Sequence, residues 1–248
     1  MERITSRTNA AVKHVKKLGN EREYRNAGRE FVCDGSRCLR EAVMCKSAIT
    51  AVFATSDRLA AEFPQLPITI VSQEILEYMS PLKSAQDVVF TCKFPELRLV
   101  NVNARNIVLD GIQDPGNVGT IIRSAAAFGF DSVILTGACA DQYNPKTIRA
   151  TMGATFRQNV VTVTTHQLSA LIHGGLTLYG AALDDEAPSL READMSRVSI
   201  AIGSEGAGLS TEVLELCKSK VFIPMEPNTE SLNAAIAASI IMWEMYRG

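Results

Sequence analysis

The stretch DPGNVGTIIRSAAAFG, residues 114–129, brings an amide and a guanidinium to the predicted start of a helix. We expect the helix to run from 118 to 128, so that Arg123 reaches its N-terminus, because helical side chains lean toward that end. The helix dipole opposes a cation there by a few tenths of a kcal/mol, a cost that an anionic ligand could offset. A structural alternative is that Arg123 pairs with Asp114 while Asn117 caps the helix.

Two later turns also combine glycines or prolines with polar side chains directly after predicted strands. GSEGAG, residues 203–208, lets a ligand approach the backbone closely and includes Glu205. Its spacing does not match the G-x-G-x-x-G pattern of dinucleotide sites, and a carboxylate would repel a pyrophosphate, so the turn favours a ligand with positive charge or hydroxyl groups. IPMEPNTESLN, residues 223–233, ends in Ser231 and Asn233, which could bind a ligand or simply cap the following helix.

The elements around these turns predict an α/β fold. From residue 106 onward, apolar runs typical of strands alternate with helical patterns, which indicates a parallel sheet covered on both faces. In such folds ligands bind beyond the carboxyl ends of the strands, and all three turns lie at such ends. We expect a smaller α/β domain over residues 1–95, a polar linker over 96–105 and the larger domain over 106–248.

The N-terminal region is basic although the whole chain is nearly neutral. Residues 1–45 contain ten lysines and arginines and six acidic residues, and residues 9–18 predict an amphipathic helix with Lys13, Lys16 and Lys17 off its apolar face. This charge pattern is typical of a module that binds a polyanion such as RNA. A solvated, charged helix without a ligand would look the same.

Several other classes of protein fit the sequence poorly. The six cysteines include no C-x-x-C pair and the three histidines stand at no ligand spacing, so we expect no metal site. The N-terminus lacks the apolar segment of a secretory signal, and no apolar run is long enough to cross a membrane. We therefore expect a cytoplasmic protein that does not bind membranes.

The C-terminal helix, predicted over residues 231–246, is apolar on nearly every side. The apolar residues around its axis are Leu232, Ala235, Ile236, Ile240, Ile241 and Trp243. A helix of this kind must be buried all round. At the end of a chain of this size a second subunit is the expected cover, so we predict a homodimer.

Taken together, the three turns resemble a known family in order and spacing. N-x-G-x-x-x-R at 117–123, G-S-E-G-x-G at 203–208, and I-P-M followed by E-S-L-N at 223–233 are similar to the motifs of the SpoU (TrmH-like) RNA ribose 2′-O-methyltransferases of the SPOUT superfamily. FVCDGSRCLREAV, residues 31–43, resembles the ribosomal-protein-like RNA-binding domain of that family, although Asp34 stands where a glutamate is usual. The resemblance implies a C-terminal SPOUT domain with a mostly parallel sheet and a deep trefoil knot, and a small N-terminal α/β RNA-binding domain.

The resemblance also implies a cofactor, S-adenosyl-L-methionine, and roles for particular residues. The implied cofactor contacts are Leu183, Gly203, Ile223 and Leu232. The implied catalytic pocket consists of Arg123, Asn117, Glu205, Ser231 and Asn233. In this family the arginine is the proposed proton acceptor and acts beside the cofactor pocket of the partner subunit. Because a guanidinium is effectively always protonated, Arg123 could instead grip the RNA phosphate or ribose while the proton leaves through phosphate or water.

The implied substrate is structured RNA. We expect ribosomal RNA because of the ribosomal-protein-like module, with transfer RNA as the alternative. A non-catalytic RNA-binding homologue is a further alternative, and the complete set of pocket residues argues against it. A nucleotide-dependent enzyme such as a dehydrogenase is disfavoured because the G-x-G-x-x-G pattern is missing.

Overall fold

The computed structural model describes residues 3–82, 85–182, 187–226 and 231–247. The chain divides into two compact units. The first unit comprises Met1–Glu96 and Tyr143–Phe156, and the second comprises Leu97–Gln142 and Arg157–Gly248. Each unit has its own sheet and its own hydrophobic core.

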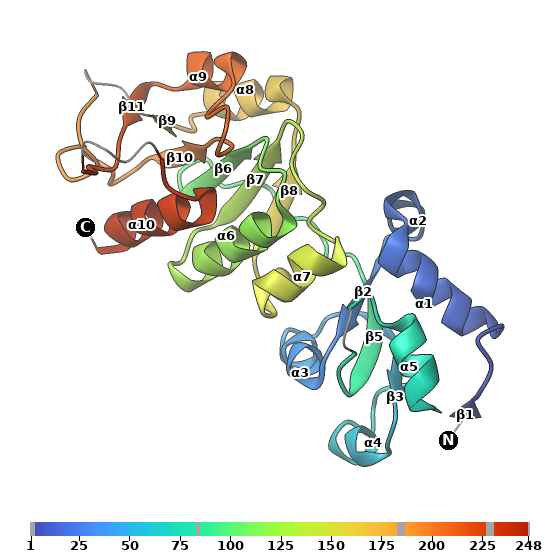
Figure 1. Ribbon diagram of the computed structural model, residues 1–248. Coiled ribbons are helices and arrows are strands. Elements are labelled where there is room, and N and C mark those ends of the chain that lie inside the picture. The colour runs from blue at the N-terminus through green and yellow to red at the C-terminus, as the bar shows by residue number, and fades with distance from the viewer. Residues whose placement is uncertain (1–2, 83–84, 183–186, 227–230, 248) are drawn as a thin grey trace. The chain divides into compact units, whose positions relative to one another are not determined.

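The first unit is built on a mixed five-stranded sheet. Its strands are β1 (Arg3–Ile4), β2 (Glu30–Asp34), β3 (Ile49–Ala54), β4 (Ile68–Val71) and β5 (Val88–Lys93). They lie in the order β1-β4-β3-β5-β2, with β5 antiparallel to both of its neighbours and the other pairs parallel. The helices are α1 (Ala10–Asn20), α2 (Arg22–Gly28), α3 (Ser36–Met44), α4 (Arg58–Glu62), α5 (Gln73–Met79) and α7 (Pro145–Thr151), with a short 3-10 helix at Ala154–Phe156. Figure 1 labels these elements.

The alternation of side chains along β2 explains why this sheet is covered on both faces. Phe31 and Cys33 belong to a core that includes buried residues of α3 and α7. Val32, between them, belongs to the core beneath α1 and α5. Because successive strand residues point to opposite faces, one short apolar strand serves both cores.

One segment of the first unit comes from far along the sequence. Residues 143–156 carry α7, and their side chains complete the core around Phe31. Tyr143 stacks on Phe94 with ring centroids 3.8 Å apart, and Ile148 is buried. We had predicted that this segment belongs to the domain over residues 106–248, because its local sequence pattern does not reveal the distant residues that bury it.

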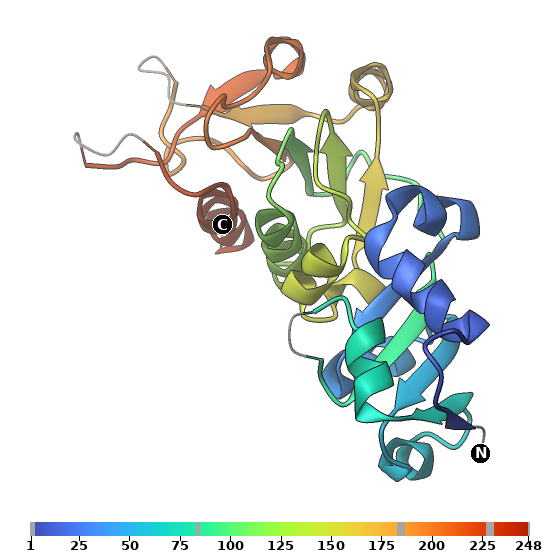
Figure 2. The same cartoon turned by 45° about the vertical axis from the view of Figure 1, so that its right-hand side comes forward.

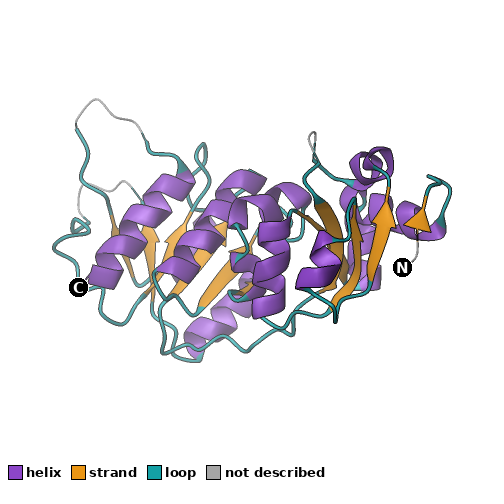
Figure 3. Cartoon of the chain, turned by 90° about the horizontal axis from the view of Figure 1, so that it is seen from below, coloured by secondary structure: helices purple, strands orange, loops and turns teal. Residues whose placement is uncertain are grey.

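The second unit contains a six-stranded, wholly parallel sheet. Its strands are β6 (Asn106–Asp110), β7 (Ser132–Thr136), β8 (Asn159–Thr162), β9 (Leu178–Ala181), β10 (Ser199–Ile202) and β11 (Ser219–Val221), in the order β11-β9-β10-β6-β7-β8. The helices α6 (Pro115–Ala127) and α10 (Ala234–Arg247) lie side by side on one face (Figure 1, Figure 2). The helices α8 (Thr165–His173) and α9 (Thr211–Leu216) pack on the other face. Figure 3 shows helices lying over the strands. The predicted α/β fold with a parallel sheet is confirmed.

Two predicted helix starts were wrong. The helix α6 begins at Pro115 and not at 118, because Asp114 caps it: Asp114 Oδ1 accepts the backbone N–H of Asn117 at 2.8 Å. Proline suits the first helical position, where its missing N–H costs nothing. The helix α10 begins at Ala234 and not at 231, so Leu232 lies before it. Four short elements, β1, α2, α4 and the 3-10 helix at Ala154–Phe156, were not predicted.

Within the described ranges, every helix is too short or too polar to span a lipid bilayer.

Candidate active site

A cavity of about 440 Å³ lies at the carboxyl ends of β9, β10 and β11. It is bounded by the glycine-rich loop 203–208, by the segment after β11 and by the first turns of α10. The predicted site residues that line it are Gly203, Glu205, Ile223, Ser231 and Leu232. Its size is typical of small-molecule sites. The second and third motifs therefore meet around one cavity at the carboxyl edge of the sheet.

The glycine-rich loop is a tight backbone turn. Ser204 and Gly208 exchange two backbone hydrogen bonds, with N···O distances of 3.0 and 2.9 Å. A Cβ on Gly203 would stand 2.0 Å from the carbonyl carbon of Gly208, and Gly208 itself has a φ of +66°. These two glycines are thus required by the loop itself, whereas the sequence suggested a ligand as the reason. A Cβ on Gly206 or on Gly208 would meet no described protein atom within 4 Å, so both glycines leave open backbone at the cavity, and Gly206 is the one of the two without a positive φ.

One side chain from each of the three motifs joins a continuous hydrogen-bond chain. Asn233 Nδ2 donates to Asn117 Oδ1 at 3.1 Å, and Asn117 Nδ2 donates to the Glu205 carboxylate. Asn233 Oδ1 accepts the backbone N–H groups of Ala235 and Ile236, at 3.0 and 3.3 Å. The fold therefore brings together side chains that are 88 and 116 residues apart in sequence.

The direction of this chain is set by the start of α10. A backbone N–H can only donate, so Asn233 must turn its oxygen to the helix and its amino group to Asn117. Asn117 must then turn its amino group to Glu205, whose carboxylate is the acceptor at the end of the chain. The sequence left open whether Asn233 caps the helix or belongs to the site. In the structure it caps α10 with its oxygen and orients Asn117 with its amino group.

Arg123 does not lie at the helix start, contrary to the sequence-based expectation. It is the ninth residue of α6, roughly 12 Å along the axis at 1.5 Å per residue. Dipole effects fade within the first turn, so the predicted opposition does not apply. The guanidinium is exposed and makes no hydrogen bond or ion pair with residues that the structure describes, so the alternative pairing with Asp114 is also wrong. None of the described residues lining the cavity belongs to α6.

The remaining predicted residues differ in how much the structure says of them. Ser231 is exposed at the cavity wall, and Ile223 and Leu232 are half-buried there. Leu183 lies outside the described residues. Across the described part of the chain, no three His, Cys, Asp or Glu side chains gather in a way that could hold a metal ion.

Asp110 is a buried residue beside the site that the sequence interpretation missed. It ends β6, and its Oδ2 accepts the backbone N–H of Ser210 at 2.7 Å. Ser210 caps α9 directly after the glycine-rich loop, so this contact ties the loop to the strand of the first motif. Burial and the nearby Asp110 charge raise the pKa of Cys217 to about 11, although Lys220 opposes the shift. The sequence did contain a signal for this residue, because Asp110 is a carboxylate at the end of the apolar run NIVLD.

The outer side of α10 leaves an apolar surface exposed in the single chain. Ile236, Ile240, Trp243 and Tyr246 form this surface, the α10 apolar face, with Ile236 53% and Trp243 50% exposed. The Trp243 ring lies 5.8 Å from that of Phe128, at the end of α6. The predicted burial of this helix on every side is therefore not provided by its own chain.

A parallel α/β sheet with a cavity at its carboxyl edge, and with an oriented carboxylate in that cavity, defines an α/β enzyme for a small organic ligand. Comparison with known families is more specific. The SpoU rRNA Methylase family matches residues 104–243, and the MRM3-like substrate binding domain matches residues 9–89. The chain belongs to the SpoU rRNA methylase family, as its motifs predicted.

Full-length relatives and solved structures agree with this assignment. The chain is 30% identical over 249 residues to the 23S rRNA (guanosine(2553)-2'-O)-methyltransferase RlmP of Bacillus subtilis (strain 168), covering 99% of both chains. It is similar to the SpoU methyltransferase AviRb from Streptomyces viridochromogenes in complex with AdoMet, with a TM-score of 0.84, 28% identity, and 96% and 97% of the two chains covered. An AdoMet-bound rRNA methyltransferase from Sinorhizobium meliloti gives a TM-score of 0.87 at 26% identity, with 99% and 97% covered.

Proposed function

We propose that this enzyme transfers a methyl group from S-adenosyl-L-methionine to a ribose 2′-hydroxyl of ribosomal RNA. Family membership and full-length similarity to a 23S rRNA 2′-O-methyltransferase support the reaction, and the AdoMet complex of a similar protein supports the cofactor. The observation that carries the proposal is the hydrogen-bond chain from Asn233 through Asn117 to Glu205, which links one side chain of each motif and ends at a carboxylate that lines the cavity. Transfer RNA is the second candidate, because some relatives are named tRNA/rRNA methyltransferases.

The lining of the cavity fits this cofactor. Ile223 and Leu232 offer an apolar wall for an adenine ring, and Gly206 offers open backbone for hydrogen bonds. Glu205 offers an acceptor for hydroxyl or cationic groups. We assign Gly203, Ile223 and Leu232 to the cofactor site, together with Leu183 from outside the described residues.

When bound, the cofactor supplies a methyl group on a positively charged sulfur, which is a good leaving group. The chain must hold the ribose oxygen in line with that methyl group, an effect that can contribute about 7–11 kcal/mol, and must receive the hydroxyl proton. We assign the proton to Glu205, because it lines the cavity and Asn117 orients its carboxylate. The cofactor would supply the methyl group by cleavage of its carbon–sulfur bond and would leave as a neutral thioether, while Glu205 would accept the hydroxyl proton and pass it to water.

Arg123 has a different role in this scheme. Its guanidinium is effectively always protonated and therefore cannot accept the proton. It is exposed and unpaired among the described residues, so it is available to bind the phosphate beside the target ribose. A cation held there also stabilises the negative charge that develops on the ribose oxygen. Ser231, at the cavity wall, completes the pocket with its hydroxyl group.

The enzyme is proposed to act as a homodimer through the α10 apolar face. An apolar surface of this kind marks an interaction site when it is contiguous. Arg123 lies on the neighbouring helix α6 but does not line the described cavity of its own chain. A second copy on this face would let Arg123 of one subunit serve the cavity of the other.

The remaining family features are proposals of the same kind. Residues 1–95 are proposed as the RNA-binding domain and 96–105 as the linker, which the match to a substrate binding domain at 9–89 supports. A trefoil knot in residues 106–248 follows from the family resemblance. A cytoplasmic location follows from the proposed ribosomal RNA substrate.

The test is a map of ribose methylation in total RNA from cells with and without this protein. We expect one 2′-O-methyl group in ribosomal RNA to disappear, and to return with the wild-type protein but not with Asn117→Ala. Loss of a methyl group from transfer RNA would select the second candidate. If no site is lost, and the purified protein with S-adenosyl-L-methionine methylates neither RNA, the proposal is wrong.

A further inference from the structure

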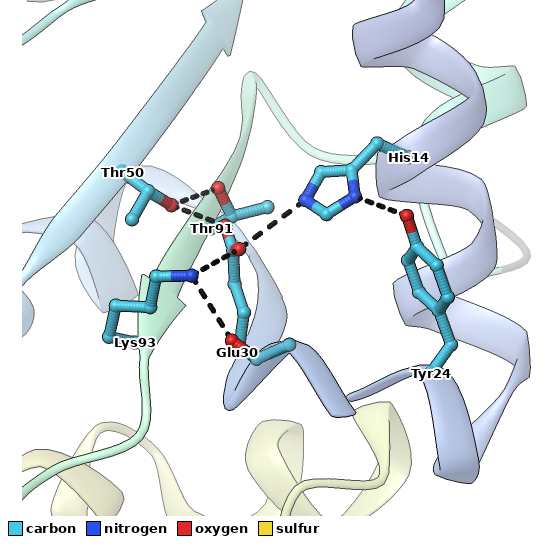
Figure 4. A network of polar contacts seen from close by, with 7 residues as sticks. His14, Tyr24, Glu30, Thr50, Thr91 and Lys93 are labelled. Carbon is cyan, nitrogen blue, oxygen red and sulfur yellow. Dashed lines mark hydrogen bonds and ion pairs between the residues drawn. The ribbon is translucent and has the colours of Figure 1, made fainter. Parts of the chain in front are cut away.

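In the part of the chain that the structure describes, two carboxylates are buried, and their surroundings differ. Glu30 and Asp110 are each only 6% exposed. Glu30, on β2, is matched by polar partners (Figure 4): its carboxylate lies 3.0 Å from Lys93 Nζ and 3.4 Å from His14 Nε2, and it accepts the Thr50 hydroxyl at 2.5 Å. Burial alone would raise the pKa of Glu30, but the hydrogen bonds from Thr50 and Lys93 hold it below its usual value. Glu30 therefore has the partners that a buried structural charge needs.

Asp110, the last residue of β6, has no cation beside it. Its carboxylate accepts one hydrogen bond, from the backbone N–H of Ser210 at 2.7 Å, and forms no ion pair with any residue of the described ranges. Burial raises the pKa of Cys139 and of Cys217, and the nearby Asp110 charge adds to both shifts. Gly137 leaves room for the carboxylate, because a Cβ there would lie 3.0 Å from Asp110 Oδ1. A buried charge without a cation costs free energy, and such breaches of packing rules concentrate at functional sites.

The contact of Asp110 with Ser210 fixes the far end of the glycine-rich loop. The loop leaves the sheet after Ile202, which pairs with Leu109 of β6. It returns to the same strand through the hydrogen bond from Ser210 to Asp110. Both ends of residues 203–209 are therefore held on β6, the strand that leads into the first motif.

A second contact holds the middle of the loop to the same motif. Glu205 accepts a hydrogen bond from Asn117, which lies in the first turn of α6 and follows Asp110 along the chain. The first motif thus contacts the loop at two points, through Asn117 and through Asp110. The position of Glu205 relative to Asn117 therefore depends on where Asp110 holds the loop.

We propose that Asp110 is a positioning residue for methyl transfer, which keeps the glycine-rich loop against β6 so that the cavity and Glu205 are in place before a ligand binds. The inference rests on the proposed function. Hydrogen bonds to a charged acceptor are roughly twice as strong as neutral ones, and a site that is already ordered loses less entropy when it binds. The structural alternative is that Asp110 only supports α9, which Ser210 caps.

Calorimetric titration of the full-length protein with S-adenosyl-L-methionine measures how each substitution affects the cavity. Asp110→Ala removes the acceptor, so the affinity should fall roughly 10- to 100-fold, as expected for a lost hydrogen bond to a charged group. Asp110→Asn keeps an oxygen for the Ser210 N–H and should stay within about fivefold of the wild type, because a neutral hydrogen bond is only moderately weaker. Glu30→Gln is the matched control, since it neutralises the other buried carboxylate and should keep the wild-type affinity.

Two further variants test the same hydrogen bond from the side of Ser210. Its φ of −64° is the value that proline requires, so Ser210→Pro removes the N–H donor without a change of φ. Ser210→Ala keeps that N–H and, like the proline variant, loses the hydroxyl that caps α9. A loss of affinity in the proline variant beyond that of the alanine variant assigns the effect to the Asp110 contact and not to α9. This comparison also decides the question if Asp110→Ala does not fold.

Hydrogen exchange of the protein without cofactor provides a readout that does not depend on activity. Residues 203–209 should exchange faster in Asp110→Ala and Ser210→Pro than in the wild type, whereas Glu30→Gln and Ser210→Ala should leave this segment unchanged. The inference is overturned if Asp110→Ala and Ser210→Pro keep the wild-type affinity and exchange, or if Glu30→Gln lowers the affinity as much as Asp110→Ala does. If the wild-type protein neither binds S-adenosyl-L-methionine nor methylates RNA, the proposed function fails, and the exchange of residues 203–209 still decides whether Asp110 holds the loop.

Discussion

Replacing Gly203 by alanine tests whether the glycine-rich loop must be closed on itself to build the cavity. The new Cβ would lie 2.0 Å from the carbonyl carbon of Gly208 and 2.2 Å from the backbone nitrogen of Leu209, where real contacts stay above 3.0 Å. The loop must therefore open by about 1 Å, which disrupts the two hydrogen bonds between Gly208 and Ser204. Two backbone hydrogen bonds are worth about 2 kcal/mol, and overpacking adds about 1–3 kcal/mol. We expect a loss of about 3–5 kcal/mol.

Gly206→Ala is the matched control on the same loop. A Cβ at Gly206 meets none of the described protein atoms within 4 Å, and the position has no positive φ. Its stability should therefore match the wild type to within ~0.5 kcal/mol, as for a surface substitution. Gly206 nevertheless lines the cavity, so a methyl group there should weaken cofactor binding if the ligand approaches the open backbone.

The assay pairs thermal unfolding with calorimetric titration of S-adenosyl-L-methionine. For a chain of this size 3 kcal/mol corresponds to a fall of about 6–12 °C in Tm. If the loop detaches locally, the same strain should appear as a loss of cofactor affinity of more than ~10-fold, since 1.4 kcal/mol is a factor of ten. The reasoning is refuted if Gly203→Ala keeps both the wild-type Tm and the wild-type affinity, or if Gly206→Ala is the less stable of the two.

Three further substitutions probe other contacts. Asn233→Asp keeps the acceptor that caps α10 but removes the donor to Asn117, so the free energy of unfolding should stay within ~1 kcal/mol of wild type while methylation falls at least tenfold. Equal activity in a methyl-transfer assay would contradict the directed hydrogen-bond chain. Trp243→Glu puts a charge on the α10 apolar face, so the variant should be a monomer in analytical sedimentation and should still bind S-adenosyl-L-methionine. A monomeric variant with full RNA methylation would exclude an active site shared between subunits. The pKa of Glu30 is lowered in the folded protein, so its carboxylate stabilises the fold above pH 4.5 and loses this effect as the pH falls through its folded-state pKa. Glu30→Gln should therefore flatten the fall of Tm below pH 4.5. An unchanged profile of Tm against pH would show that the Glu30 carboxylate does not stabilise the fold.

The sequence predicted most of the sheet because apolar runs in buried strands are a strong local signal. The alternation of strands and helices after residue 106 was predicted correctly. The start of α6 was misread because a proline beside a glycine looks like a turn, whereas Asp114 and Pro115 form a good helix start. The short helix α2 has only one buried residue, Arg25, and so carries no apolar pattern to detect.

The site was predictable at the level of motifs but not of contacts. Parallel strands place their carboxyl ends at one edge, so the meeting of the glycine-rich loop with the segment before α10 follows from topology. The hydrogen bonds of Asn117 to Glu205 and Asn233 depend on side-chain directions that spacing does not fix. The distance of Arg123 from the helix start was underestimated because α6 begins three residues earlier than predicted, which lengthens that distance by nearly one helical turn.

The two units share more of the chain than the predicted linker implies. The chain leaves the second unit after Gln142, contributes residues 143–156 to the first, and returns at Arg157. Tyr143 belongs to the buried core of the first unit, so that unit is incomplete without residues from the methyltransferase half of the sequence. Removing residues 1–95 would leave these apolar side chains without their partners, and exposed apolar surface favours aggregation. The two units therefore depend on each other in folding, and a fragment of the first unit must carry residues 143–156 to be a fair test of the proposed RNA binding.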